Sequence, residues 1–197
     1  MSNSTTQQIS PRVVTFPYAL KFTDAHLYIF VTAFVALDVA IPWACHLIYP
    51  LAGATFLPMF FFTLLAGLLF GWRAGLMVGF LTPLISFGVS GMPVLARLPQ
   101  IVIENSVFGL SAGLLYGGFR LNIIWSLLGT MVIGRLALVL AVLVLHFGEV
   151  NPLIWVWQTI QLGWPGLVIQ LVCLPPIVKG LSYWLSKRNS ERQSGRQ

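Results

Sequence analysis

Asp38, Glu104 and Arg135 each lie inside a long apolar stretch of this sequence, and they are the first candidates for chemistry. An uncompensated charge at the centre of a helix in lipid costs about 2.5 kcal/mol or more, so each should face protein, an opposite charge or a water-filled cavity. An arginine side chain is long enough to reach a carboxylate that lies several residues away in height. We therefore predict an ion pair between Arg135 and Glu104, with Asp38 as the other possible partner.

The predicted pair has two interpretations. It is either a purely structural buried pair, or a site where a ligand anion or a polar headgroup bridges the two charges. Asn105 follows Glu104 directly and adds a second polar side chain to the same apolar stretch. The residue types alone leave both interpretations open.

Further candidates lie near the expected ends of the apolar stretches. Trp43 and His46 could contact a ligand, or they could be a membrane-interface tryptophan and a solvated histidine at a helix end. Aromatic and amide side chains then alternate in the segment with Trp155, Trp157, Gln158, Gln161 and Trp164. That segment fits the membrane interface, and it also fits a stacking and hydrogen-bonding wall for a small ring-bearing ligand.

Signatures of an enzyme or a metal site are missing from the sequence. It has no His-Glu-x-x-His segment and no Gly-Lys-Ser/Thr phosphate loop, and Asp38 and Glu104 lie in separate stretches. Cys45 and Cys173 are too far apart for a metal or redox motif. We predict a protein with no catalytic residues, no metal and no cofactor.

The composition indicates the fold class. Hydrophobic residues make up 57% of the chain and charged residues 8%, which excludes a soluble globular domain. A membrane-spanning helix needs roughly 20 apolar residues. The sequence therefore predicts an all-α integral membrane protein with six transmembrane helices, at 26–45, 56–70, 74–89, 98–117, 122–147 and 163–186. Residues 1–25 and 187–197 are predicted as tails.

The distribution of basic residues predicts the orientation, because Lys and Arg concentrate in cytoplasmic segments close to the membrane. If both termini are cytoplasmic, Arg97 is the one basic residue in the opposite loops. The cytoplasmic set is then Arg12, Lys21, Arg73, Arg120, Lys187, Arg188, Arg192 and Arg196. We interpret the net charge of +6 as an orientation signal and not as nucleic-acid binding, since no basic patch interleaves with aromatic residues.

Small residues predict close helix packing in two regions. Gly67, Gly71, Gly75 and Gly79 recur every fourth residue, as do Gly109, Gly113 and Gly117, and such stripes let helix backbones approach closely. In the first span, Ala33, Ala36, Ala40 and Ala44 share one face, with Asp38 on roughly the opposite side. This alanine stripe either packs within the chain or docks another membrane subunit.

An ordered set of short motifs resembles the substrate-binding S components of energy-coupling factor (ECF) transporters. The resemblance covers about residues 27–180. Its motifs are Pro42-Trp43 with His46, Leu57-Pro58, 65–69, Gly91-Met92-Pro93, Glu104 with Phe108-Gly109, Gly134-Arg135 and 163–171. The family often has Tyr-Gly where this chain has Phe108-Gly109, so a hydroxyl group is missing there.

The resemblance implies the substrate-specific binding subunit of an ECF-type ABC importer in the plasma membrane of a prokaryote. Residues 26–186 would form a six-helix domain that captures a vitamin or related micronutrient outside. A coupling transmembrane subunit and two cytoplasmic ATP-binding subunits would then drive its delivery inward. Ala36 and Ala40 match the Ala-x-x-x-Ala spacing that the family uses against the coupling subunit.

The family's ligand pockets lie toward the outer half of the bundle. The resemblance therefore implies ligand contacts for Glu104, Asn105, Arg135, Gln161 and Trp164. A membrane scaffold or assembly subunit of the same span count is the alternative function. The two are distinguished by whether a small molecule binds.

Overall fold

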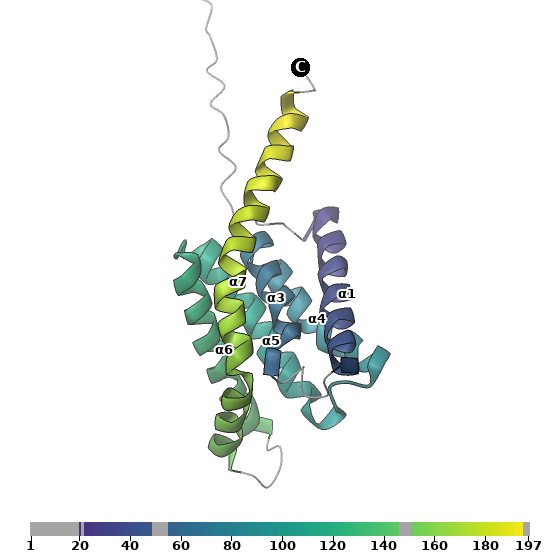
Figure 1. Cartoon of the computed structure of the whole chain (residues 1–197), viewed down its shortest axis with the longest axis vertical. Coiled ribbons are helices and arrows are strands. Elements are labelled where there is room, and N and C mark those ends of the chain that lie inside the picture. The colour runs from purple at the N-terminus through teal and green to yellow at the C-terminus, as the bar shows by residue number, and fades with distance from the viewer. Residues whose placement is uncertain (1–19, 21, 49–54, 146–150, 195–197) are drawn as a thin grey trace, which may run out of the picture.

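The computed structural model describes residues 20, 22–48, 55–145 and 151–194. This part of the chain is all helical, with six main helices that run alternately up and down (Figure 1). They are α1 (Ala25–Ile48), α3 (Pro58–Phe70), α4 (Trp72–Ser90), α5 (Leu98–Gly113), α6 (Ile123–Leu145) and α7 (Pro152–Ser194). A 3₁₀ turn (Leu95–Arg97) precedes α5, and a π-helical turn (Leu114–Gly118) follows it. The predicted six-helix fold is confirmed.

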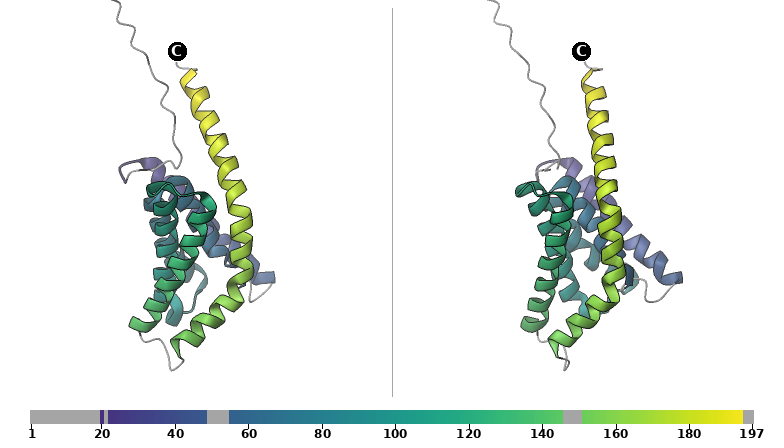
Figure 2. Two further views of the ribbon diagram at one scale, coloured as in Figure 1. Left: turned by 90° about the vertical axis from the view of Figure 1, so that its left-hand side faces the viewer. Right: turned by 60° about the vertical axis from the view of Figure 1, so that its left-hand side comes forward.

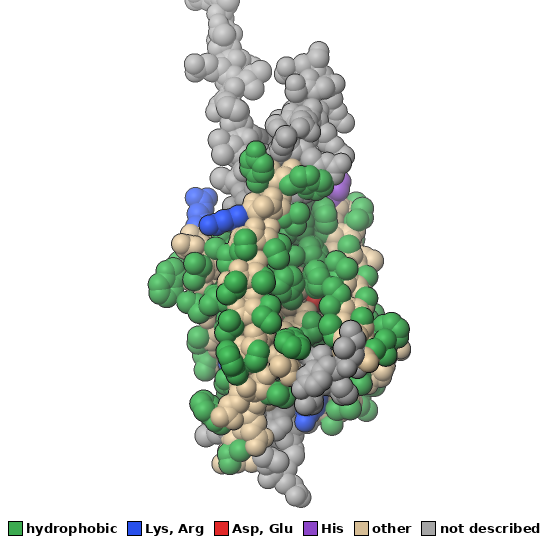
Figure 3. All heavy atoms as spheres, in the orientation of Figure 1, with side chains coloured by type: hydrophobic (Ala, Val, Ile, Leu, Met, Phe, Trp, Pro, Cys, Tyr) green, Lys and Arg blue, Asp and Glu red, His purple; other side chains and the backbone are tan. Residues whose placement is uncertain are grey.

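Length and exposure both fit a membrane protein. Five helices are long and apolar enough to cross a bilayer, while α3 has 13 residues and is buried along most of its length. Leu64 and Leu68 of α3 lie at the centre of the core, with the other helices around them. Hydrophobic side chains also cover most of the visible outer face (Figure 3), which is the surface that a bilayer requires.

Glycine contacts hold α3, α4 and α5 close together at the end of the bundle near the C-terminus. Gly75 of α4 faces Gly109 of α5 so closely that a methyl group on either would collide with the other's backbone. Gly113 meets the backbone of Trp72, and Gly67 meets that of Gly109 in the same way. The prediction from the glycine stripes is therefore confirmed, and backbone-to-backbone packing fixes this end of the bundle.

Helix α1 presents two different faces. Ala36 and Ala40 are exposed, as are Ala33 and Ala44, so the alanine stripe does not pack within the described chain. Asp38 is fully buried on the other side of the helix, as its position in the sequence predicted. Its carboxylate accepts hydrogen bonds from the hydroxyl groups of Thr63 in α3 (3.0 Å) and Thr82 in α4 (3.5 Å). Asp38 thus ties α1 to its two neighbours.

The last helix differs from its predicted boundaries. The sixth span was predicted at 163–186, but α7 runs without interruption for 43 residues, from Pro152 to Ser194. Proline is tolerated in the first turn of a helix, and glycine is absent from residues 152–162, so nothing delays the start. Pro165 lies inside α7 and bends it instead of ending it, and Figure 2 shows the first part of α7 inclined to the rest.

Candidate functional site

A cavity of about 470 Å³ is lined by residues from the start of α3, the end of α4 and the start of α5, among others. Figure 1 shows these helix ends at the end of the bundle farthest from the C-terminus. Pockets for small molecules have volumes of roughly 300 to 1,000 Å³. All six main helices contribute to its lining: Pro42 and Trp43 from α1, Pro58 to Phe60 from α3, Ser86 and Ser90 from α4, Gln100, Ile101 and Glu104 from α5, Arg135 and Leu138 from α6, and Gln158, Thr159 and Leu162 from α7. Leu57 and residues 92–94 and 97 complete the lining.

An ion pair forms the polar floor of the cavity. Arg135 Nη1 donates to Glu104 Oε1 at 2.7 Å, and the two side chains are 12% and 5% exposed. The predicted Arg135–Glu104 contact is therefore confirmed. The neighbouring residues explain it: Gly134 has no side chain, and the ring of Phe108 from α5 occupies that space. The two helices are close enough there for Arg135 to reach Glu104.

Asp38 does not take part in this pair. Its carboxylate bonds instead to Thr63, to Thr82 and to the backbone N–H of Phe62, and it does not line the cavity. The alternative pairing of Arg135 with Asp38 is thus not formed. The two buried carboxylates have separate surroundings, one bonded to neutral donors and the other to a cation.

Two buried polar side chains in the cavity lining have no partner among the described residues. Gln100 is 3% exposed and Ser86 is 4% exposed, and neither side chain hydrogen-bonds to another residue in the described part of the chain. Ser90 is different, since its hydroxyl donates to the Ser86 carbonyl at 2.8 Å and accepts from the Met92 N–H at 3.3 Å. The cavity therefore has hydrogen-bonding groups that are available to a ligand.

The wall formed by the start of α3 is held in place from α7. Leu57 has left-handed backbone angles, φ 49° and ψ 44°, which are unfavourable for a residue with a side chain. Gln170 Nε2 donates to the Leu57 carbonyl at 3.1 Å from a fully buried position. Gly166, one turn earlier in α7, packs directly against the backbone of Phe56. These contacts fix the residues at the start of α3 that line the cavity.

The structure brings some of the other predicted site residues to the cavity and not the rest. Trp43 lines it. Asn105 is fully buried away from it, and neither atom of its amide has a partner among the described residues. Gln161 and Trp164 are exposed and do not line it. The side chain of His46 lies outside the described residues, although its backbone belongs to α1.

Helix geometry explains where the sequence prediction missed. Each residue of a helix turns by about 100°, so the continuous α7 carries Gln158, Thr159 and Leu162 to the cavity side and Trp164 to the opposite side. Gln100 was not predicted, but it lies four residues before Glu104 and so shares its face of α5. That spacing was the signal that could have found it.

Comparison with known proteins gives a match to a protein family. The family model described as "ECF transporter, substrate-specific component" matches residues 28–178. No curated protein and no solved structure matches the chain. The matched range includes every residue that lines the cavity.

Proposed function

Since that match covers most of the chain, the protein belongs to the substrate-specific components of ECF transporters, and we propose that its cavity captures a vitamin or related micronutrient. The observation that carries this proposal is the cavity itself. It has the size of a small-molecule site, it is lined by all six helices, and its floor is a buried ion pair.

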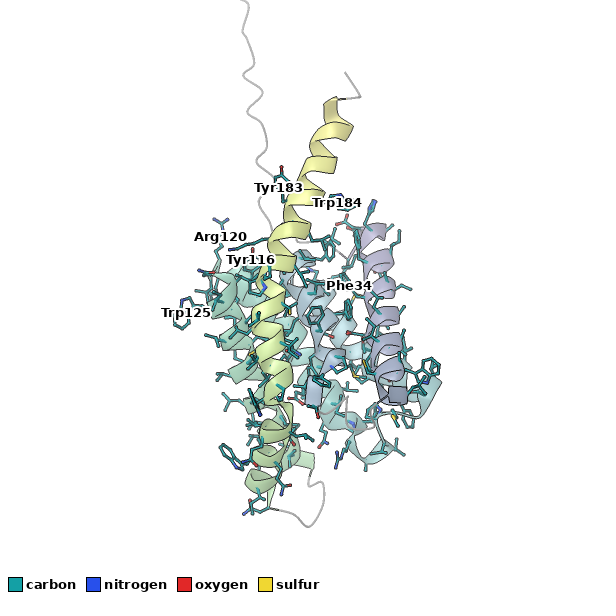
Figure 4. The ribbon with its side chains drawn as sticks, in the orientation of Figure 1. Phe34, Tyr116, Arg120, Trp125, Tyr183 and Trp184 are labelled. Carbon is teal, nitrogen blue, oxygen red and sulfur yellow. The ribbon has the colours of Figure 1, made fainter. Side chains whose placement is uncertain are left out.

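We further propose that the cavity opens on the outer side of a prokaryotic plasma membrane, with both termini in the cytoplasm. The basic residues support this orientation: Arg73 is in the first turn of α4 and Arg120 follows the π-helical turn. Both segments lie toward the end that carries the C-terminus (Figure 1). Figure 4 shows Arg120 there together with Tyr183 and Trp184. Cytoplasmic loops carry an excess of Lys and Arg, and aromatic residues gather at the membrane interface.

Delivery of the substrate requires partners in this proposal. The exposed Ala36 and Ala40 are the docking face for a coupling transmembrane subunit, because small residues allow another helix to come close. Two cytoplasmic ATP-binding subunits supply the energy. The sequence supports a separate energy source, since it contains no Gly-Lys-Ser/Thr phosphate loop.

The test is a thermal-stability screen of the purified protein against water-soluble vitamins and their precursors. A ligand at a hundred times its dissociation constant stabilises the native state by roughly 2.7 kcal/mol. We expect one compound to raise the unfolding temperature, and Ile101→Trp, which fills the cavity from α5, to abolish the shift. The matched control is Ile103→Trp, at an exposed position of the same helix, which should retain the shift.

Two results would count against the proposal. If binding survives Ile101→Trp but is lost in Ile103→Trp, the cavity is not the binding site. If a folded protein binds no compound of the panel, the scaffold function gains weight over capture.

A further inference from the structure

We propose that the cavity recognises its ligand through an uncharged head group that both donates and accepts hydrogen bonds, such as an amide or a ring lactam, on an apolar ring-bearing body. This inference rests on the proposed function and specifies the substrate class for the same cavity. It follows from three features of the lining: its charge balance, its free hydrogen-bonding groups and its apolar walls.

The charges on the floor of the cavity are already balanced. In the described part of the chain, the charged side chains that line the cavity are Arg97, Glu104 and Arg135, and the last two pair with each other at 2.7 Å. A carboxylate head would place a second anion on Arg135, whose Nε has no partner among the described residues, and an ammonium head would place a second cation on Glu104. Either would add a charge to a pair that is already neutral and leave one buried charge uncompensated, which is strongly unfavourable. An uncharged head leaves the pair intact.

The free polar groups call for a ligand with both a donor and an acceptor. The amide of Gln100 offers N–H donors and a carbonyl acceptor, and the hydroxyl of Ser86 offers one of each. Glu104 uses Oε1 for Arg135, and its other carboxylate oxygen has no partner among the described residues. Gln100 and Glu104 lie one helical turn apart on the same face of α5. An amide or lactam has the complementary pair of groups on adjacent atoms.

The remaining lining sets the character of the ligand's body. Trp43, Leu57, Phe60 and Leu138 supply apolar surface from α1, α3 and α6 and the residue before α3, and Ile101 and Leu162 add to it. Two of these side chains are aromatic and can stack on a ring.

Three small probes with the same phenyl ring and a neutral, an anionic or a cationic head group test this inference. Benzamide, benzoate and benzylammonium share one ring, and their dissociation constants can be measured at pH 7 by ligand-observed NMR on the full chain in lipid nanodiscs. We expect benzamide to bind at least tenfold more tightly than either charged probe. Loss of probe binding in the variant Ile101→Trp, which fills the cavity, assigns the binding to the cavity.

Variants of the free polar groups supply the second readout. Gln100→Leu keeps the size of the side chain and removes its amide, so it should weaken benzamide about tenfold and leave both charged probes unchanged. The matched control, Gln161→Leu, makes the same change at an exposed position outside the cavity and should change nothing. Ser86→Ala, a smaller change, should weaken benzamide about threefold, and it serves if Gln100→Leu does not fold.

The outcomes separate this inference from the proposed function. Equal or tighter binding of benzoate or benzylammonium overturns the uncharged head group while capture in the cavity stands. The same conclusion follows if a vitamin binds in the cavity but none of the three probes binds: the uncharged head group is overturned and capture in the cavity stands. If neither probes nor vitamins bind, both the inference and the proposed function fail.

Discussion

The two ends of α5 show how one helix can serve packing at one end and binding at the other. Near the C-terminal end of the bundle, Gly75 and Gly109 bring the backbones of α4 and α5 into direct contact. At the cavity end of α4, a methyl group added to Gly88 or Gly91 would meet no atom within 4 Å. Gln100 and Glu104 of α5 lie at that open end, where the Gln100 amide and one carboxylate oxygen of Glu104 have no partner among the described residues.

The difference indicates that the glycine end is the fixed base and the cavity end the part adapted to a ligand. Where backbones are packed in direct contact, a substitution that adds side-chain volume cannot be accommodated locally and strains its neighbours. Buried polar groups without hydrogen-bond partners are unfavourable for stability, and proteins retain them where a ligand or water forms the missing hydrogen bonds. Substitutions should therefore affect mainly stability at the glycine end and mainly affinity at the cavity end.

A large loss of stability is expected at the glycine end. Gly109→Ala places a methyl group against the backbone of Gly75, and overpacking of this kind destabilises by about 1–3 kcal/mol. Gly88→Ala is the matched control, because its methyl group meets open space and alanine favours a helix. Thermal unfolding of both variants measures the contrast. Equal unfolding temperatures would show that the two ends do not differ in packing.

The second effect concerns the ion pair. Glu104→Ala leaves Arg135 without its partner, and loss of a hydrogen bond to a charged group should lower stability by roughly 1.5–3 kcal/mol. In the double variant Glu104→Leu/Arg135→Leu neither charge remains, so stability should largely return, whereas ligand binding should be lost in both variants. Recovery of both would mean that the pair is purely structural, which was one of the two interpretations drawn from the sequence.

Most of the fold follows from simple physical rules that act along the sequence. The lengths of the apolar stretches predicted the six helices, and the glycine spacing predicted close contacts between helices such as that of α4 with α5. The cost of burying an unpaired charge predicted the Arg135–Glu104 pair. The start of α7 was missed because the aromatic and amide residues after Pro152 are compatible with a helix and with an interface segment. Local composition does not choose between them.

The lining of the cavity was harder to predict because it depends on how each helix is rotated. Asn105 is next to Glu104 in sequence, yet it turns by about 100° and is buried elsewhere. Gln158 lines the cavity and Gln161 does not, although they look alike in sequence. The left-handed Leu57 also gives no signal, because such angles are usually taken by glycine.

A smaller effect is expected where α7 holds the cavity wall. Gln170→Leu removes the hydrogen bond to the Leu57 carbonyl, and a lost hydrogen bond of this kind should lower stability by about 1 kcal/mol. Because Leu57 and the residues after it line the cavity, ligand affinity should fall as well. Calorimetric unfolding and binding measured on one preparation check both effects. Unchanged affinity would show that the wall does not need this contact.

The smallest effect on the protein itself is expected on the outer face of α1. Ala36 and Ala40 are exposed, and the contacts that hold α1 to α3 and α4 are made by other side chains, among them Asp38 and Phe30. Ala36→Leu/Ala40→Leu should therefore leave the unfolding temperature and ligand affinity unchanged. It should abolish co-purification with the coupling subunit, because a helix can no longer approach closely.

A control for that variant adds bulk to another exposed helix face at the same spacing. Val132→Leu/Leu136→Phe changes two exposed residues of α6 that lie four positions apart. If both double variants still co-purify with the coupling subunit, α1 is not the docking face. If both lose the coupling subunit, added bulk acts without regard to position. If only the α1 variant loses the coupling subunit, assembly depends on the outer face of α1. It is then independent of the stability set at the glycine end of α5 and of the ligand affinity set at the cavity end, because neither changes in that variant.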